Sequence, residues 1–129
     1  MKLIPPSKVE IKDSPGKGLG VFSMKKIFKG EIIEECPLFT LKKRETIKEF
    51  HNYVFNYPQG FTNTEIVLPW GFGCIYNHSD DNNAYWRDHP KYKAFQFIAN
   101  RDIEVGEEVC TYYGDEDYYW DKRKQITKI

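Results

Sequence analysis

The residues whose side chains are best suited to bind a ligand or take part in a reaction lie in the middle of the chain. An apolar run from Gly71 to Tyr76 leads directly into Asn77-His78-Ser79, and turn-forming Asp and Asn residues follow as far as Asn83. Apolar neighbours draw such a segment toward the interior, where an amide, an imidazole and a hydroxyl each require hydrogen-bonding partners. Two interpretations are open at this point: a ligand-binding site, or polar residues that satisfy one another in an ordinary turn.

A glycine-rich segment near the start of the chain is a second candidate. Gly16-Lys17-Gly18-Leu19-Gly20 precedes the apolar pair Val21-Phe22. Glycine permits positive φ and lets backbone N–H groups approach a ligand closely. The Lys-Ser/Thr ending of a Walker A loop is absent and no long helix is expected to follow, which argues against P-loop and dinucleotide folds. A plain hairpin turn is the simpler interpretation of this segment on its own.

The three cysteines do not have the spacing of a metal site. Cys36, Cys74 and Cys110 are far apart in apolar surroundings, whereas zinc sites use paired spacings such as C-x-x-C. We therefore expect buried free thiols in a reducing compartment, and no metal.

Composition and charge limit the classes of function. The 129 residues suffice for one domain, and 19 basic side chains balance 19 acidic ones. Direct nucleic acid binding is not expected, because no positive surplus exists. The N-terminus lacks a signal-peptide pattern and no apolar run approaches the length of a membrane span. These features predict a single domain that is not associated with a membrane and lies in the cytoplasm.

The elements that must position these residues are mostly strands. Alternating apolar residues and short β-rich runs predict strands near residues 9–11, 31–40 (interrupted at Pro37), 66–70, 84–86, 94–99 and 109–113. Apolar residues at three- and four-residue steps, Ile47, Phe50, Val54 and Tyr57, predict an amphipathic helix from Lys42 to about Tyr57. The sequence thus predicts an α+β domain, mostly β, with an inserted helical region at about 41–65 and an aromatic tail at 115–129.

Four short motifs resemble, in order and spacing, those of the SET-domain protein lysine methyltransferases. They are Gly18-Leu19-Gly20-Val21-Phe22, Asn77-His78-Ser79, Gly106-Glu107-Glu108 and Tyr113-Gly114. The resemblance extends from about Lys8 to Trp120 and is greatest to the minimal, viral-type SET proteins. It implies a single SET domain over residues 1–129, built of several small sheets, in which the C-terminal tyrosine segment forms a pseudo-knot beside Asn77-His78.

The resemblance also implies a reaction, a cofactor and a set of site residues. The reaction is methyl transfer from S-adenosylmethionine to the ε-amine of a lysine in a protein or peptide substrate. By resemblance, Tyr113 stands at the methyl-transfer centre as the catalytic residue. The implied cofactor residues are the backbone of Lys17, Gly18, Leu19 and Gly20, the channel residue Tyr53, the Asn77 side chain, the His78 backbone, Tyr113 and a stacking aromatic, Trp120 in preference to Tyr119.

The sequence departs from the family pattern in several places. Asp80 and Asn82 stand where relatives carry Cys and Pro, which we expect to reduce the rigidity of the loop. These 129 residues do not include the cysteine-rich zinc segment that follows the domain in many relatives. Thr111 lies where many relatives carry an aromatic residue that limits methylation, so the number of methyl groups stays open. Glu107 and Glu108 are expected to be turn and strand residues rather than acid–base catalysts.

Alternatives to this function also remain open, as do the substrate and the oligomeric state. One alternative is a catalytically silent SET-like module that binds a peptide or partner protein, and the other is a structural β-scaffold whose motif matches are accidental. The substrate would be a histone, with nuclear localisation in a eukaryotic host, or another protein. We predict a homodimer, in which exposed apolar residues such as Phe50, Phe55 and Phe61 form a self-complementary patch across a two-fold axis; the alternative is that these aromatics pack inward.

Overall fold

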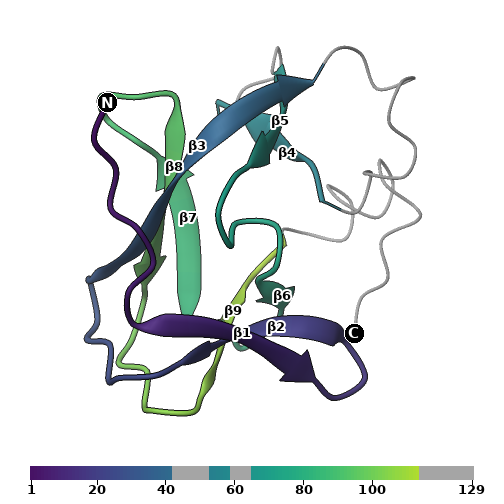
Figure 1. Ribbon diagram of the computed structural model, residues 1–129, viewed down its shortest axis with the longest axis vertical. Helices are drawn as coiled ribbons and strands as arrows, with labels where there is room; N and C mark the ends of the chain where they lie inside the picture. The colour runs from purple at the N-terminus through teal and green to yellow at the C-terminus, as the bar shows by residue number, and fades with distance from the viewer. Residues whose placement is uncertain (42–52, 59–64, 114–129) are drawn as a thin grey trace.

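The computed structural model describes residues 1–41, 53–58 and 65–113. Their strands, in chain order, are β1 (Val9–Ser14), β2 (Gly18–Ser23), β3 (Ile32–Leu41), β4 (Phe55–Tyr57), β5 (Glu65–Pro69), β6 (Asn77–His78), β7 (Ala84–Asp88), β8 (Ala94–Ala99) and β9 (Glu108–Thr111). These residues form no helix, and therefore none that could span a membrane. The mostly β character predicted from the sequence is confirmed (Figure 1).

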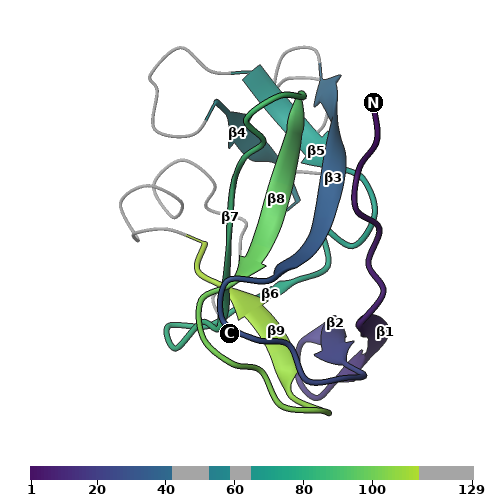
Figure 2. The ribbon, with the colours of Figure 1, turned by 90° about the vertical axis from the view of Figure 1, so that its left-hand side faces the viewer.

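The strands form two sheets. One has four strands in the order β1-β2-β9-β6, and the other has five in the order β4-β5-β3-β8-β7. Figures 1 and 2 show the four-stranded sheet at the lower end of the molecule, with the five-stranded sheet extending above it. Neighbouring strands are antiparallel except β6 and β9, which pair in parallel.

The five-stranded sheet carries the aromatic part of the core. Every residue of β8 is buried; five of the six are apolar, and the side chain of the sixth, Gln96, bonds to Glu35 and Arg87. Phe55 contacts Trp86 edge-on with the ring centroids 4.9 Å apart, and it contacts Phe95 at 5.5 Å. Such pairs add to the free energy gained by burying the rings.

The predicted interruption at Pro37 is wrong. Strand β3 runs through this residue, which pairs with Ala94 of β8. A proline removes only its own N–H from the ladder, and the Pro37 carbonyl still accepts a bond from the backbone N–H of Trp70 (2.9 Å). The register shift in β3 lies earlier, between Ile32 and Glu34.

The predicted helix is wrong at its C-terminal end. Phe55–Tyr57 form β4, which pairs with β5 through Phe55 opposite Val67 and Tyr57 opposite Glu65. The helical spacing of apolar residues is overridden because β5 supplies a pairing partner from outside this segment. Residues 42–52 of the predicted helix lie outside the described residues.

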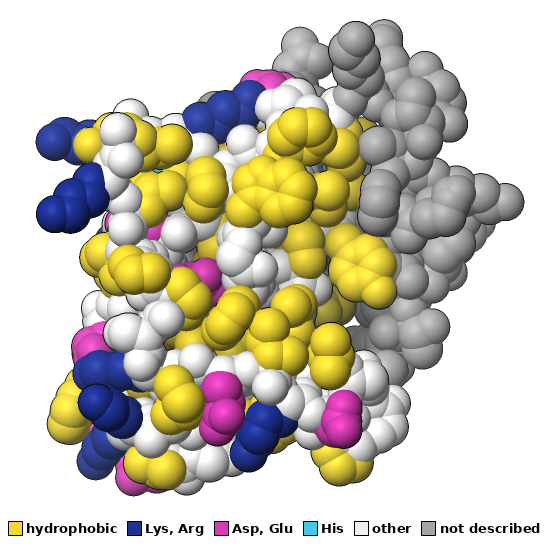
Figure 3. Space-filling model, viewed as in Figure 1, with side chains coloured by type: hydrophobic (Ala, Val, Ile, Leu, Met, Phe, Trp, Pro, Cys, Tyr) yellow, Lys and Arg dark blue, Asp and Glu magenta, His cyan; other side chains and the backbone are white. Residues whose placement is uncertain are grey.

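The predicted dimer patch loses one of its members. Phe55 is buried in the core, so its ring cannot serve an interface, and Phe50 and Phe61 lie outside the described residues. Apolar side chains do gather across the middle of the face seen in Figure 3. Phe39 and Trp70 are exposed large aromatics whose ring centroids are 5.6 Å apart. The homodimer stays a prediction.

Candidate functional site

Strand β9 is the centre of the candidate site. On one side it pairs with β2, and on the other it pairs in parallel with Asn77-His78 of β6. The residues that follow β6 also bond to β9. The backbone N–H of Ser79 donates to the Thr111 carbonyl (2.9 Å), and that of Asn83 donates to the Cys110 carbonyl (3.2 Å). β9 thus lies between β2 and the 77–83 stretch.

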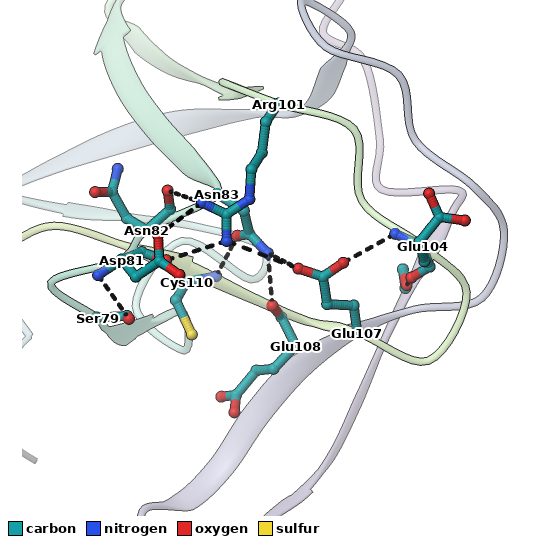
Figure 4. A network of polar contacts seen from close by, with 10 residues as sticks. Ser79, Asp81, Asn82, Asn83, Arg101, Glu104, Glu107, Glu108 and Cys110 are labelled. Atoms are coloured by element: carbon teal, nitrogen blue, oxygen red, sulfur yellow. Dashed lines mark hydrogen bonds and ion pairs between the residues drawn. The ribbon is translucent and has the colours of Figure 1, made fainter.

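The buried side chain of Asn83 fastens this stretch to β9 (Figure 4). Its Oδ1 accepts the backbone N–H of Cys110 (2.8 Å). Its Nδ2 donates to the backbone carbonyl of Glu108 (2.8 Å) and to Glu107 Oε2 (3.1 Å). A side-chain amide therefore replaces ladder hydrogen bonds that a regular neighbouring strand would make.

Arg101 holds the outer part of the same loop (Figure 4). Its guanidinium donates to the Asp81 carboxylate (3.0 Å), to the Asp81 carbonyl and to the Asn82 carbonyl (both 3.2 Å). It also lies 3.9 Å from Glu107 Oε2. The sequence analysis did not identify Asn83 or Arg101, whose roles depend on partners far away in the chain.

The Glu108 carboxylate joins three segments. Ser14 Oγ donates to its Oε1 (2.9 Å) and Asn77 Nδ2 donates to its Oε2 (2.7 Å). Asn77 Nδ2 also donates to the Leu19 carbonyl (3.0 Å). Glu108 thus belongs to the strand, as expected, and its carboxylate organises the site.

The glycine-rich segment is a hairpin whose second strand lies beside β9. Ser14 pairs with Gly18, and Gly18 has a φ of 81° that favours glycine. A Cβ on Gly20 would lie 2.5 Å from Glu108 Oε2 and 3.0 Å from Asn77 Nδ2. Gly20 is therefore required by packing inside the protein, a reason that differs from the predicted close approach of a ligand.

His78 and Tyr113 are in direct contact. The buried His78 ring accepts the Tyr113 backbone N–H at Nδ1 (2.9 Å), so a neutral ring carries its proton on Nε2. Nε2 lies 2.9 Å from Asp80 Oδ1 and donates to it. Asp80, which departs from the family pattern, therefore has a specific partner that the sequence analysis did not predict.

The Tyr113 side chain is also fixed. Its hydroxyl donates to the Tyr76 carbonyl (2.8 Å), and its ring centroid lies 5.1 Å from that of His78. Two hydrogen bonds, one at the backbone N–H and one at the hydroxyl, therefore set the direction of this tyrosine.

The structure brings most of the predicted site residues together, but not all. Asn77, His78 and Tyr113 meet around β9, and Leu19 of the hairpin reaches Asn77. Tyr53 is 48% exposed, and its carbonyl accepts a bond from Cys74 Sγ (3.4 Å). Lys17 lies in the turn, where its backbone N–H donates to the Ser14 carbonyl (2.9 Å). Tyr119 and Trp120 lie outside the described residues.

The cysteines are free and their thiols are hard to ionise. Cys36 and Cys110 are buried and Cys74 is half-buried. Burial raises the pKa of Cys74 to about 12 and that of Cys110 to about 11, and it raises the pKa of Cys36 further. The described residues contain no group of three His, Cys, Asp or Glu that could hold a metal ion.

Comparison with known proteins identifies the family. The SET domain model matches residues 18–114. A Schizosaccharomyces pombe protein named histone-lysine N-methyltransferase, H3 lysine-37 specific, is 29% identical over 124 residues, covering 95% of this chain and 84% of that protein. A crystal structure of a Plasmodium falciparum protein, described as a candidate histone methyltransferase, is 33% identical with a TM-score of 0.72, covering 84% of this chain and 94% of that one. The chain belongs to the SET domain family.

Proposed function

We propose that this SET-domain protein transfers methyl groups from S-adenosylmethionine to the ε-amine of lysine in a protein substrate. The observation that carries the proposal is the placement of Tyr113, fixed by His78 and by the Tyr76 carbonyl beside Asn77 and the glycine-rich hairpin. Family membership and relatives named as histone methyltransferases support the methyltransferase class.

The residues around β9 fit the proposed cofactor. The Asn77 amide nitrogen is occupied by Glu108 and the Leu19 carbonyl. Its Oδ1 has no hydrogen-bond donor among the described residues, so this oxygen is available to accept from the ammonium group of a methionine moiety. Gly18 has open space where a Cβ would be, which leaves room for a ligand against the hairpin.

The chemistry required of the protein is mostly positioning and desolvation. Bound S-adenosylmethionine supplies a methyl group that its sulfonium already activates. The acceptor lysine must be neutral, although its ordinary pKa is about 10.4, and an aromatic channel near a positive charge lowers that pKa by desolvation and repulsion. The Tyr113 hydroxyl would orient the amine toward the methyl group. Because this hydroxyl donates its proton to a carbonyl, its oxygen would act toward the substrate amine as a hydrogen-bond acceptor.

A histone is the proposed first acceptor to test, because both relatives are named for histone methylation. The pure protein is titrated with S-adenosylmethionine by calorimetry and then incubated with labelled cofactor, core histones and host-lysate proteins. We expect saturable cofactor binding and labelled lysine. A folded protein that neither binds the cofactor nor transfers label contradicts the proposal.

The catalytically silent module is the second candidate. It would give cofactor or peptide binding without labelled product on any acceptor. The intact set of Asn77, His78 and Tyr113 contacts argues against it, because a module that only binds a peptide does not need a fixed tyrosine hydroxyl.

A further inference from the structure

Strand β3 contains a buried carboxylate next to the candidate site that the proposed chemistry does not use. Glu34 is 1% exposed. Its Oε1 accepts the Tyr76 hydroxyl (2.6 Å) and its Oε2 accepts the Phe72 backbone N–H (3.3 Å). No cationic side chain among the described residues forms an ion pair with it. Burial raises the pKa of Glu34 above its ordinary value.

Tyr76, the side-chain partner of Glu34, is held by contacts to its ring, its hydroxyl and its backbone carbonyl. The Tyr76 ring is buried and stacks on Phe97 with the centroids 4.6 Å apart. Its hydroxyl is bound to the carboxylate, and its backbone carbonyl accepts the Tyr113 hydroxyl (2.8 Å). Tyr76 therefore connects the Glu34 carboxylate with the hydroxyl proposed to orient the substrate amine.

The segment before Tyr76 packs against the Glu34 carboxylate. Gly71 has a φ of 86°, and a Cβ there would lie 2.7 Å from Glu34 Oε2. A Cβ on Gly73 would lie 2.6 Å from the Pro69 Cβ and 3.2 Å from Cys36 Sγ. The backbone at Gly71 and Phe72 thus lies directly against the Glu34 carboxylate, and the segment that begins there leads straight into Asn77-His78.

Stability alone does not account for this arrangement. A buried carboxylate without a cation costs free energy, and an apolar pair of the same shape is often as stable or more stable. What a carboxylate adds is direction, since its two oxygens fix both a tyrosine hydroxyl and a backbone N–H in one place.

We infer that Glu34 is a positioning residue for methyl transfer: it fixes Tyr76 so that the Tyr76 carbonyl holds the Tyr113 hydroxyl in place. This inference rests on the proposed function. Glu34 touches neither substrate nor cofactor, and it acts only through Tyr76.

The chain supplies a matched control on the next residue of β3. Glu35 is also a buried carboxylate, but its bonds go to Gln96 Nε2 (2.7 Å), the Ile4 backbone N–H (2.9 Å) and His89 Nε2 (3.0 Å). Substitution of Glu35 removes comparable bonds from a similar depth without disturbing the Gly71–Tyr76 segment.

The experiment compares Glu34→Gln, Tyr76→Phe, their double variant and Glu35→Gln. Melting temperature, cofactor Kd, kcat and KM are measured, together with the NMR signal of Tyr113 in protein carrying ring-labelled tyrosine. We expect Glu34→Gln and Tyr76→Phe each to lower kcat by about tenfold or more, with cofactor Kd within about twofold and a shifted Tyr113 signal. The double variant should be no slower than the worse single variant, because both act through one contact. Glu35→Gln should lower the melting temperature and leave kcat and the Tyr113 signal unchanged.

The outcomes separate this inference from the proposed function. An unshifted Tyr113 signal in Glu34→Gln and Tyr76→Phe overturns the inference even if the wild-type protein transfers no methyl group. Additive losses in the double variant, or an equal loss of kcat in Glu35→Gln, overturn it as well. Absence of transfer by the wild-type protein, with a Tyr113 signal that shifts as expected, contradicts the proposed function alone.

Discussion

The two sheets are held together by different chemistry. The five-stranded sheet is antiparallel throughout and is packed with apolar and aromatic side chains, with every residue of β8 buried. In the four-stranded sheet, β6 has only two residues, and side chains such as Asn83 and Glu108 supply the bonds that a longer ladder would provide. Stability is therefore expected to reside in the first sheet and the orientation of reactive groups in the second.

The largest effect is expected on the free energy of unfolding, from a substitution in the five-stranded sheet, and it tests whether that sheet provides most of the stability. Phe95→Ala removes a fully buried ring from β8, and we expect a loss of about 3–5 kcal/mol in the free energy of unfolding. Urea denaturation measures the loss. Cofactor affinity at low temperature, where the variant is still folded, should stay near that of the wild type. A loss below about 1 kcal/mol would mean that this sheet does not dominate stability.

Tyr113→Phe is the corresponding change at the site. It removes the hydroxyl bound to the Tyr76 carbonyl, and we expect kcat for methyl transfer to fall by roughly two orders of magnitude, the scale seen when one preorganised polar group is deleted. The melting temperature and the cofactor Kd should change little, because the hydroxyl does not hold the cofactor. Turnover close to that of the wild type would reject the catalytic assignment.

Asn77→Ala should have a smaller effect that falls on both binding and structure. It removes the proposed acceptor for the cofactor ammonium and leaves Glu108 Oε2 without the bond from Nδ2. We expect cofactor binding to weaken by more than about 1 kcal/mol. Asn82→Ala, which loses a bond to the Ala84 carbonyl in the same loop, is the control and should bind the cofactor normally. Equal affinities for the two variants would argue against the role of Asn77.

A pH-dependent effect is expected from Glu34 on β3 of the five-stranded sheet, whose carboxylate accepts the hydroxyl of Tyr76, the residue before β6 of the other sheet. Burial raises its pKa in the folded state above the ordinary value of 4.5. The folded state therefore binds this proton more tightly than the unfolded state does. The stabilising contribution is complete below pH 4.5 and is lost as the pH rises through the folded pKa. The stability difference between wild type and Glu34→Gln should thus become less favourable to the wild type from pH 4 to pH 8. A pH-independent difference would show that the carboxyl group does not titrate in this way.

Local sequence patterns predicted the strands of the core, but they did not predict strand β4 or the continuation of β3 through Pro37. The run at 94–99 is apolar except for Gln96 and gives the buried strand β8 directly. Strand β4 was missed because its pairing depends on β5 rather than on its own residues. Pro37 did not break β3, since a proline carbonyl can still accept a ladder bond.

The site was predictable only through the resemblance to a family. Spacing alone left Asn77-His78 as either a turn or a ligand site, and the contact between His78 and Tyr113 joins residues 35 positions apart. Glu34 gave no signal, because its partner Tyr76 lies 42 positions further along the chain. Residues that organise a site through distant partners have no local pattern by which to be found.

The smallest expected effect is a difference in the rate at which a cysteine of each sheet is alkylated, which reports how readily the two sheets open. Burial raises the pKa of Cys110 to about 11, so at pH 8 about one thiol in a thousand is ionised in the folded protein. Alkylation of Cys110 on β9 and of Cys36 on β3 therefore requires local opening of their strands. We expect iodoacetamide to label Cys110 before Cys36, because β9 depends on side-chain bonds and β3 lies inside the larger core. Mass spectrometry of peptides over a time course measures the order, with urea-unfolded protein as the control in which both react at similar rates. Equal protection of the two cysteines would mean that the sheets open together as one cooperative unit, and the division between a stable sheet and an orienting sheet would then not extend to their dynamics.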